Sequence, residues 1–174
     1  MWWYAACGGG FRGRRWNMKK LFPYALSILV LEGLGGLGAI FTVPAISGWY
    51  AELVKPRGTP PDWVFGPVWT FLYALLGIVL ARVWLLPRET KGRRAALIWF
   101  GVQLALNLIW SPVFFGLRQP LAGFVVIWAL LGAIRMTAAA VVRVDRTAAG
   151  LLWPYALWVA YATYLNAGIW FLNR

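Results

Sequence analysis

Five apolar stretches of about twenty residues, separated by short polar segments, dominate the sequence. They cover residues 22–46, 63–86, 95–116, 121–142 and 150–171. An α-helix needs about 20 apolar residues to cross the roughly 30 Å hydrocarbon layer of a membrane, and stretches this uniform leave no polar face for water. The sequence therefore predicts an all-α membrane protein, a bundle of five transmembrane helices within residues 22–172, after a basic extension at 1–21.

Composition and charge support this interpretation. Hydrophobic residues make up 61% of the chain and charged residues 13%, which leaves no room for a separate soluble domain. The net charge of +12 comes from short loops, with eleven Lys and Arg on the N-terminal side against four on the other, so we expect no nucleic-acid partner. By the positive-inside rule, this asymmetry predicts a bacterial inner-membrane protein with a cytoplasmic N-terminus. Arg82 and Arg135, inside predicted helices, are expected to reach lipid headgroups.

Residues 1–17 differ from the rest of the chain. They hold three Trp, three consecutive Gly and three Arg, directly before Met18 and two lysines. Two interpretations stay open: Met18 is the natural start, or residues 1–21 form a disordered basic tail. Cys7 is the only cysteine, so the sequence predicts neither a disulfide nor a thiolate metal cluster.

Missing residue types exclude several kinds of chemistry. The chain has no histidine, which excludes a His-ligated haem, a His-based zinc site and a Ser-His-Asp triad. We therefore expect no metal site and no cofactor. Glu32 is the one acidic residue inside a predicted span, beside Gly33 and Gly35. A functional carboxylate and a role in helix packing remain alternatives for it.

Tryptophan is abundant, with thirteen residues in the chain. The belt of Trp at the membrane surface accounts for those near predicted helix ends. Four others, Trp69, Trp110, Trp128 and Trp158, lie about 9 Å or more inside their spans at 1.5 Å per residue. We expect Trp128 to pack in the core, whereas the other three have neighbours at helical spacing.

Three groups of residues share a helix face because they are three or four positions apart. They are Trp69 with Tyr73, Gln103 and Asn107 with Trp110, and Trp158 with Ala162 and Asn166. In the predicted orientation these groups gather in the outer half of the bundle, with Trp158 nearer the middle. They predict an aromatic pocket for a flat apolar ligand. The buried amides should bond to another helix or to that ligand.

The first loop, residues 47–62, is the only long one. It contains two aromatic residues, three prolines and mixed charges. Proline fixes φ and stiffens the chain, so we expect an ordered lid at this end of the bundle.

Motifs in the first loop and in the third and fifth predicted helices resemble one known family. They read Trp49-Tyr50-x-x-Leu53-x-Lys55-Pro56 with Pro60-Pro61 and Trp63-Val64-Phe65, then Gln103-Leu104-x-x-Asn107-x-x-Trp110-Ser111-Pro112, and Pro154-Tyr155-x-x-Trp158-x-x-x-Ala162-Thr163-x-Leu165-Asn166. They are similar to the signatures of the translocator protein family, also called tryptophan-rich sensory proteins or peripheral-type benzodiazepine receptors. The resemblance covers residues 22–172.

The resemblance implies a five-helix bundle, usually a homodimer, in contact with membrane lipid. It implies binding of porphyrins such as protoporphyrin IX, benzodiazepine-type ligands and, in animals, cholesterol. The porphyrin would be a ligand without a histidine bond to iron. Carried over by position, the implied ligand-binding residues are Tyr50, Trp69, Tyr73, Asn107, Trp110, Trp158 and Ala162.

The chain departs from the family pattern in two places. Arg57 and Gly58 stand where the family usually has an aromatic residue, so the lid would close less well, or Arg57 would meet a propionate. The fifth helix lacks the proposed cholesterol motif, because no basic residue follows Tyr161 and Tyr164 before Arg174.

Three functions remain open at this point. The first, which we favour, is a membrane receptor or sensor of tetrapyrroles that regulates a tetrapyrrole or stress response. The second is an enzyme that degrades porphyrin in light and oxygen, with Trp69 and Trp158 as the implied redox-active pair. The third is a translocator of porphyrin, lipid or sterol, for which the sequence offers no inverted repeat.

Overall fold

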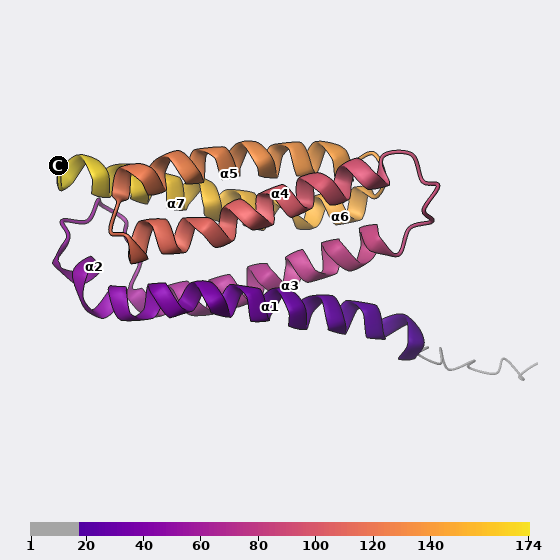
Figure 1. Ribbon diagram of the computed structural model, residues 1–174, viewed down its shortest axis with the longest axis horizontal. Helices are drawn as coiled ribbons and strands as arrows, with labels where there is room; N and C mark the ends of the chain where they lie inside the picture. Colours follow the sequence, from indigo (N-terminus) through magenta and orange to yellow (C-terminus); the bar gives the residue numbers. More distant parts are fainter. Residues whose placement is uncertain (1–17) are drawn as a thin grey trace, which may run out of the picture.

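The computed structural model describes residues 18–174, and it places them in helices joined by short connections (Figure 1). In chain order the helices are α1 (Met18–Ser47), α2 (Trp49–Glu52), η1 (Asp62–Val64), α3 (Phe65–Trp84), α4 (Arg93–Ser111), η2 (Pro112–Gly116), α5 (Pro120–Val141), α6 (Arg146–Leu151) and α7 (Trp153–Leu172). The expectation of a tail at residues 1–21 falls mostly outside the described residues.

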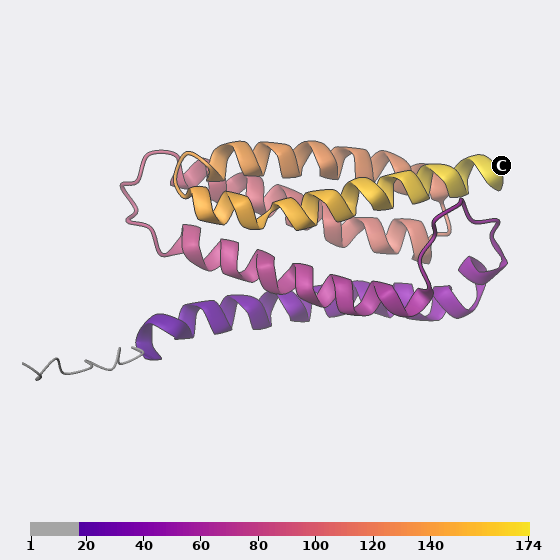
Figure 2. The same ribbon diagram turned by 180° about the vertical axis from the view of Figure 1, so that it is seen from behind.

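The long helices run side by side along the long axis of the molecule, namely α1, α3, α4, α5 and α7 (Figures 1 and 2). Helices α1 and α3 pack against each other and form one layer, and α4, α5 and α7 form the other. The first loop, α2 and the C-terminus lie together at one end of the bundle. The start of α1, the α3–α4 connection and α6 lie at the opposite end.

The apolar stretches predicted as membrane spans form long helices. Within residues 18–174, four segments are long and apolar enough to cross a membrane, namely Leu21–Ser47, Asp62–Trp84, Arg93–Gly116 and Pro120–Val141. The all-α prediction is thereby confirmed for these residues, and the four segments agree with the predicted membrane spans. Helix α7 has 20 residues, but its three Trp and three Tyr lower its mean hydropathy, and a fifth span stays a prediction.

Helices α1 and α3 approach closely at two glycines. A Cβ atom at Gly77 would lie 2.7 Å from Cα of Ile28, and one at Gly35 would lie 2.5 Å from Cε2 of Tyr73. Small residues allow helix backbones to approach in this way where no hydrophobic effect drives association. From Glu32 toward the first loop, the two helices border a cavity.

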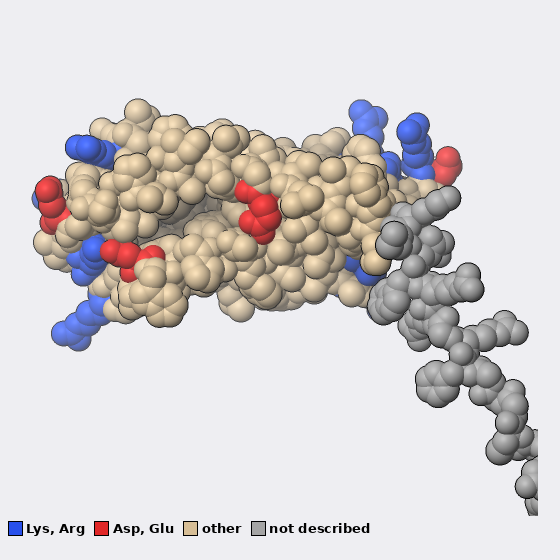
Figure 3. Space-filling view, turned by 90° about the horizontal axis from the view of Figure 1, so that it is seen from below, with Lys and Arg blue, Asp and Glu red and all other residues tan. Residues whose placement is uncertain are grey.

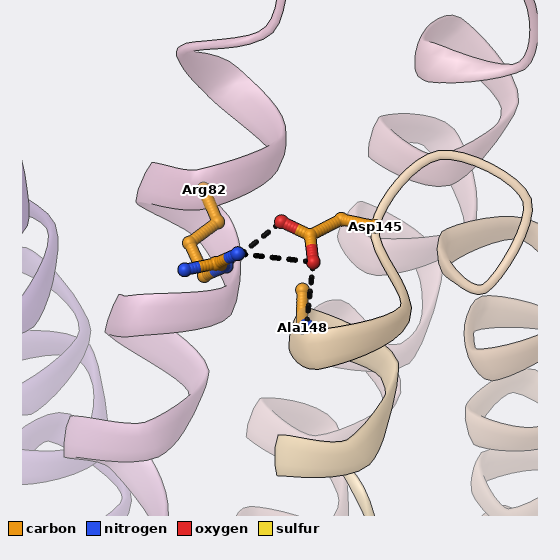
Figure 4. Close-up of polar contacts among 3 residues, drawn as sticks. All are labelled: Arg82, Asp145 and Ala148. Atoms are coloured by element: carbon orange, nitrogen blue, oxygen red, sulfur yellow. Dashed lines mark hydrogen bonds and ion pairs between the residues drawn. The ribbon is translucent and has the colours of Figure 1, made fainter.

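An ion pair joins two helices at the end of the bundle opposite the first loop (Figure 4). Arg82 donates from Nε and Nη2 to the two carboxylate oxygens of Asp145, at 2.8 and 3.1 Å. Asp145 also caps α6, since its Oδ1 accepts a hydrogen bond from the backbone N–H of Ala148 at 2.9 Å. The expectation that Arg82 reaches lipid headgroups is therefore wrong, because its guanidinium is held by this carboxylate.

The expectation that Trp128 packs in the core is also wrong. Its side chain is 58% exposed on the outside of α5, where it contacts Phe124 edge to face at a ring-centroid distance of 6.3 Å. Leu130 and Ile127, on the other side of the same helix, are buried instead. An apolar surrounding on all sides of a membrane helix removes the contrast that would reveal its inner face.

Candidate functional site

A cavity of about 450 Å³ lies between α1, α3, α4 and α7 at the end of the bundle that carries the first loop. Figure 3 shows it as a hollow in the surface on the side of α1 and α3. Its lining residues are Glu32, Gly35, Gly36, Gly38, Ala39, Thr42, Val43, Ile46, Asp62, Trp63, Phe65, Gly66, Trp69, Thr70, Tyr73, Asn107, Leu108, Trp110, Ser111, Phe115, Trp158 and Ala162.

The structure brings six of the seven candidate ligand-binding residues to this cavity. Trp69 and Tyr73 come from α3, Asn107 and Trp110 from α4, and Trp158 and Ala162 from α7. The helical spacing therefore identified side chains that meet in space. Their role in binding a ligand is a separate matter and is proposed below.

Tyr50, the seventh candidate, does not line the cavity. It is 3% exposed and packs edge to face on Phe114 and Phe115, with ring centroids 6.4 and 5.6 Å away. The ammonium of Lys55 lies 4.5 Å above its ring. Burial, with smaller contributions from Asp62 and Tyr161, raises the pKa of Tyr50 to about 12. Tyr50 is thus a neutral side chain that supports the wall behind Phe115.

A chain of buried hydrogen bonds crosses the bundle next to the cavity. The hydroxyl of Tyr73 donates to Oδ1 of Asn107 at 2.6 Å, and Nδ2 of Asn107 donates to the hydroxyl of Tyr155 at 2.9 Å. Tyr155 in turn donates to Oε1 of Gln103 at 2.8 Å. The expected pairing of Asn107 and Gln103 with another helix is confirmed, and it fixes the positions of α3, α4 and α7 around the cavity.

Sequence reasoning missed Tyr155 as a partner of the two amides. Its side chain is fully buried, and it stands directly after Pro154 at the start of α7. The available signal was indirect: Gln103 and Asn107 are one turn apart, so one hydroxyl between them can satisfy both. Nothing in the sequence showed which helix would supply that hydroxyl.

The indole ring of Trp110 is held in one orientation. Its Nε1 donates to Oδ1 of Asn166 at 3.2 Å, and Nδ2 of Asn166 donates to the carbonyl of Pro120 at 2.7 Å. On its other side the ring stacks on Phe114, with centroids 5.3 Å apart and planes inclined by 20°. Trp110 therefore offers the cavity a fixed aromatic surface.

Trp69 and Trp158 contribute two further aromatic surfaces. Trp69 lies 5.8 Å from Tyr73 between ring centroids, and Trp158 lies 6.0 Å from Phe65 and 5.6 Å from Tyr161. The buried Nε1 of Trp158 has no hydrogen-bond partner within residues 18–174. Its N–H is therefore a free donor beside the cavity.

The first loop is bonded to α7 across the end of the bundle. Asn173 accepts a hydrogen bond from the backbone N–H of Val54 and donates one to its carbonyl, both at 2.9 Å. Tyr161 donates to the carbonyl of Gly58, and Tyr164 donates to that of Arg57 at 3.0 Å. These bonds order the loop, and its action as a lid stays a prediction. The Arg57 side chain is exposed and does not line the cavity.

Several lining residues were not among the candidates from the sequence. Asp62 and Trp63 lie in η1, and Phe65 is the first residue of α3. Glu32, for which function and packing were both open, also lines the cavity. Within the described part of the chain, no group of three or more Cys, Asp or Glu side chains is placed to hold a metal ion.

Comparison with known proteins places these features in a family. Residues 26–171 match the TspO/MBR family. The chain is 42% identical over 155 residues to the tryptophan-rich protein TspO of Chlorobaculum tepidum, covering 89% of this chain and 98% of that protein. It is 44% identical over 157 residues to the protein of the same name from Archaeoglobus fulgidus, with 90% and 99% covered. It is also 42% identical over 126 residues to the human translocator protein, with 70% and 73% covered.

Proposed function

Because the chain belongs to the TspO/MBR family of membrane proteins, we propose that it is a receptor that binds porphyrins of the protoporphyrin IX type. Other flat apolar molecules, including benzodiazepine-type ligands, would occupy the same cavity. Occupancy would regulate a tetrapyrrole or stress response. The observation that carries the proposal is the set of indole rings from three helices around one cavity, formed by Trp69, Trp110 and Trp158.

Shape and surface of the cavity support a flat ligand. Its volume of about 450 Å³ lies within the range of roughly 300–1,000 Å³ that is common for small-molecule sites. Aromatic side chains bind planar ligands through stacked and edge-to-face contacts. Trp110 is fixed by Asn166 and Phe114, so a planar ligand meets a surface that is already in place.

We also propose five spans in a bacterial inner membrane, with the N-terminus in the cytoplasm. Helix α7 has 20 residues, about 30 Å at 1.5 Å per residue, and runs beside α5 along the bundle. Arg88, Lys91, Arg94, Arg143 and Arg146 lie at the end of the bundle where α1 begins. That end would face the cytoplasm by the positive-inside rule.

A second function, degradation of bound porphyrin in light and oxygen, is supported by the position of two residues. Trp69 and Trp158 both line the cavity, so a bound porphyrin that absorbs light would lie against both indole rings. Dioxygen would be the oxidant. Transport of porphyrin, lipid or sterol is the remaining alternative, and the cavity on the side of α1 and α3 would be its entrance.

A titration separates these functions. Detergent-purified protein is titrated with protoporphyrin IX in the dark while tryptophan fluorescence is followed, and the porphyrin absorbance is then followed in light. Trp128→Phe is the matched control, because that residue is exposed outside the cavity. Saturable quenching is expected in the dark, and its absence would overturn the porphyrin proposal. Loss of absorbance in light that disappears in Trp69→Phe and Trp158→Phe, with binding retained, would support the enzyme.

A further inference from the structure

The charged residues that line the cavity are all acidic. They are Glu32 from α1 and Asp62 from η1, and no Lys or Arg of residues 18–174 lines the cavity. Figure 3 shows acidic side chains on both sides of the hollow. Lys55, on the first loop, has its ammonium over the ring of Tyr50 instead. The cavity therefore presents negative charge to whatever enters it.

Glu32 lies in the middle of a membrane helix without a partner. Its Oε1 is shielded from solvent and accepts no hydrogen bond from any described residue. A carboxylate at such a position is costly unless a cation or a donor pairs with it. The residue is half-buried and lines the cavity, so a molecule in the cavity can reach its side chain.

Three hydroxyl groups that line the cavity, those of Tyr73, Ser111 and Thr42, have other partners. The Tyr73 hydroxyl donates to Asn107. Ser111 donates to the carbonyl of Gly38 at 2.8 Å, and its Oγ lies 2.7 Å from that of Thr42. These side chains line the cavity, but their hydroxyls are already used. A bound molecule that carries a donor can therefore pair with Glu32 without displacing these bonds.

Aromatic faces beside a carboxylate favour a cation. Ring quadrupoles attract ammonium groups that lie over the ring face. The cavity has such faces on three helices, including Trp69, Trp110 and Trp158. An anionic group next to Glu32 would be repelled, so the propionates of a porphyrin would have to point away from Glu32.

We propose that the cavity selects organic amines, with a flat apolar body between the indole rings and a protonated nitrogen at the Glu32 carboxylate. This inference rests on the cavity being a ligand site, as proposed above. It adds charge as a criterion of selection: an amine binds more tightly than a neutral or anionic molecule of the same shape.

Three pyrene probes test the proposal, because they share one flat body and differ in charge. They are 1-pyrenemethylamine, 1-pyrenemethanol and 1-pyrenecarboxylic acid. Binding is measured at pH 7 in a non-ionic detergent by saturable energy transfer from tryptophan to pyrene. The amine is expected to bind at least about tenfold more tightly than the alcohol, and the acid most weakly. Equal affinity of the amine and the alcohol would overturn the proposal.

Two variants show whether Glu32 is responsible. Glu32→Gln keeps the shape of the side chain and removes its charge, so the amine should lose its advantage while affinity for the alcohol stays unchanged. Glu52→Gln is the control, since Glu52 is exposed and does not line the cavity, and it should behave as wild type. An equal loss for amine and alcohol in Glu32→Gln would mean a structural role and overturn the proposal. Thermal melts confirm that both variants are folded.

The outcome for porphyrin is read separately in the same preparation. Saturable quenching by protoporphyrin IX without preference for the amine would leave the porphyrin receptor standing and overturn the amine proposal. Preference for the amine without saturable porphyrin quenching would overturn the porphyrin receptor and leave the amine proposal standing.

Discussion

Tyr73 packs its ring directly on the backbone of Gly35, where a Cβ atom would come within 2.5 Å of Cε2 and 2.7 Å of Cδ2. The same tyrosine donates from its hydroxyl to Asn107. One side chain therefore couples α1 to α3 and α4 beside the cavity. The contact depends on the missing side chain at Gly35, because Cβ atoms do not approach ring carbons this closely.

Gly35→Ala is expected to displace the Tyr73 ring and strain its bond to Asn107. The change should lower the melting temperature in detergent and weaken protoporphyrin binding by several-fold. Gly33→Ala is the matched control, because nothing lies within 4 Å of a Cβ atom at that position. Ala is the better helix former by up to about 1 kcal/mol, so the control should melt at the same or a higher temperature. A Gly35→Ala protein as stable as Gly33→Ala would contradict the importance of the contact.

Tyr155→Phe should destabilise the protein more than Tyr73→Phe. Removing the Tyr155 hydroxyl leaves both Nδ2 of Asn107 and Oε1 of Gln103 without partners, whereas removing that of Tyr73 leaves only Oδ1 of Asn107. Each buried polar group without a partner costs roughly 1–3 kcal/mol. Melting of both variants and of the double variant gives the ranking. Equal losses for the two single variants would show that water or another group replaces the bonds.

The sequence predicted the parts of this site that follow from local spacing. Trp69 and Tyr73 share a face in any α-helix, and so do Asn107 and Trp110, and these residues do meet at the cavity. The sequence could not predict Tyr155 as their partner or the Arg82–Asp145 pair, because both depend on which helices become neighbours. Partners that are 48, 52 and 63 positions apart leave no local pattern.

The outward position of Trp128 has a physical explanation. The sequence predicted this residue in the core, yet its side chain is exposed on the outside of α5. In a membrane both faces of a helix are apolar, so hydrophobicity does not tell the inside from the outside. The rotation of each helix is decided by its packing partners instead.

Asn173→Ala is expected to release the first loop from α7. The variant loses both bonds to the backbone of Val54, and since a hydrogen bond contributes about 0.5–1.5 kcal/mol, the Val54 amide should exchange its hydrogen up to about tenfold faster. Hydrogen exchange followed by mass spectrometry measures this. If the loop acts as a lid, protoporphyrin should also dissociate faster.

Tyr164→Phe is the control for this experiment. The tyrosine is exposed, and its hydroxyl donates to the carbonyl of Arg57, not to Val54. The Val54 amide should therefore keep its wild-type exchange rate in this variant. Equal acceleration in both variants would mean that the loop opens as one unit, and that Asn173 is not its specific tie.

Asp145→Asn should lower stability at neutral pH and reduce its dependence on acid. Burial alone would raise the pKa of Asp145, but the bonds from Arg82 and the backbone N–H groups of Ala148 and Thr147 outweigh it and hold the pKa below its usual value. A carboxyl with a lowered pKa stabilises the fold fully above its unfolded pKa, about 3.9, and this contribution is lost as the pH falls through the folded pKa.

Asn still caps helices well, so the Asp145→Asn variant isolates the ion pair. We expect a loss of roughly 1–3 kcal/mol at pH 7, with the melting curves of wild type and variant converging below about pH 4. Asp145→Ala, which removes the cap as well, should melt at a lower temperature than Asp145→Asn at every pH. Equal melting temperatures of wild type and Asp145→Asn at pH 7 would show that the ion pair with Arg82 does not stabilise the fold.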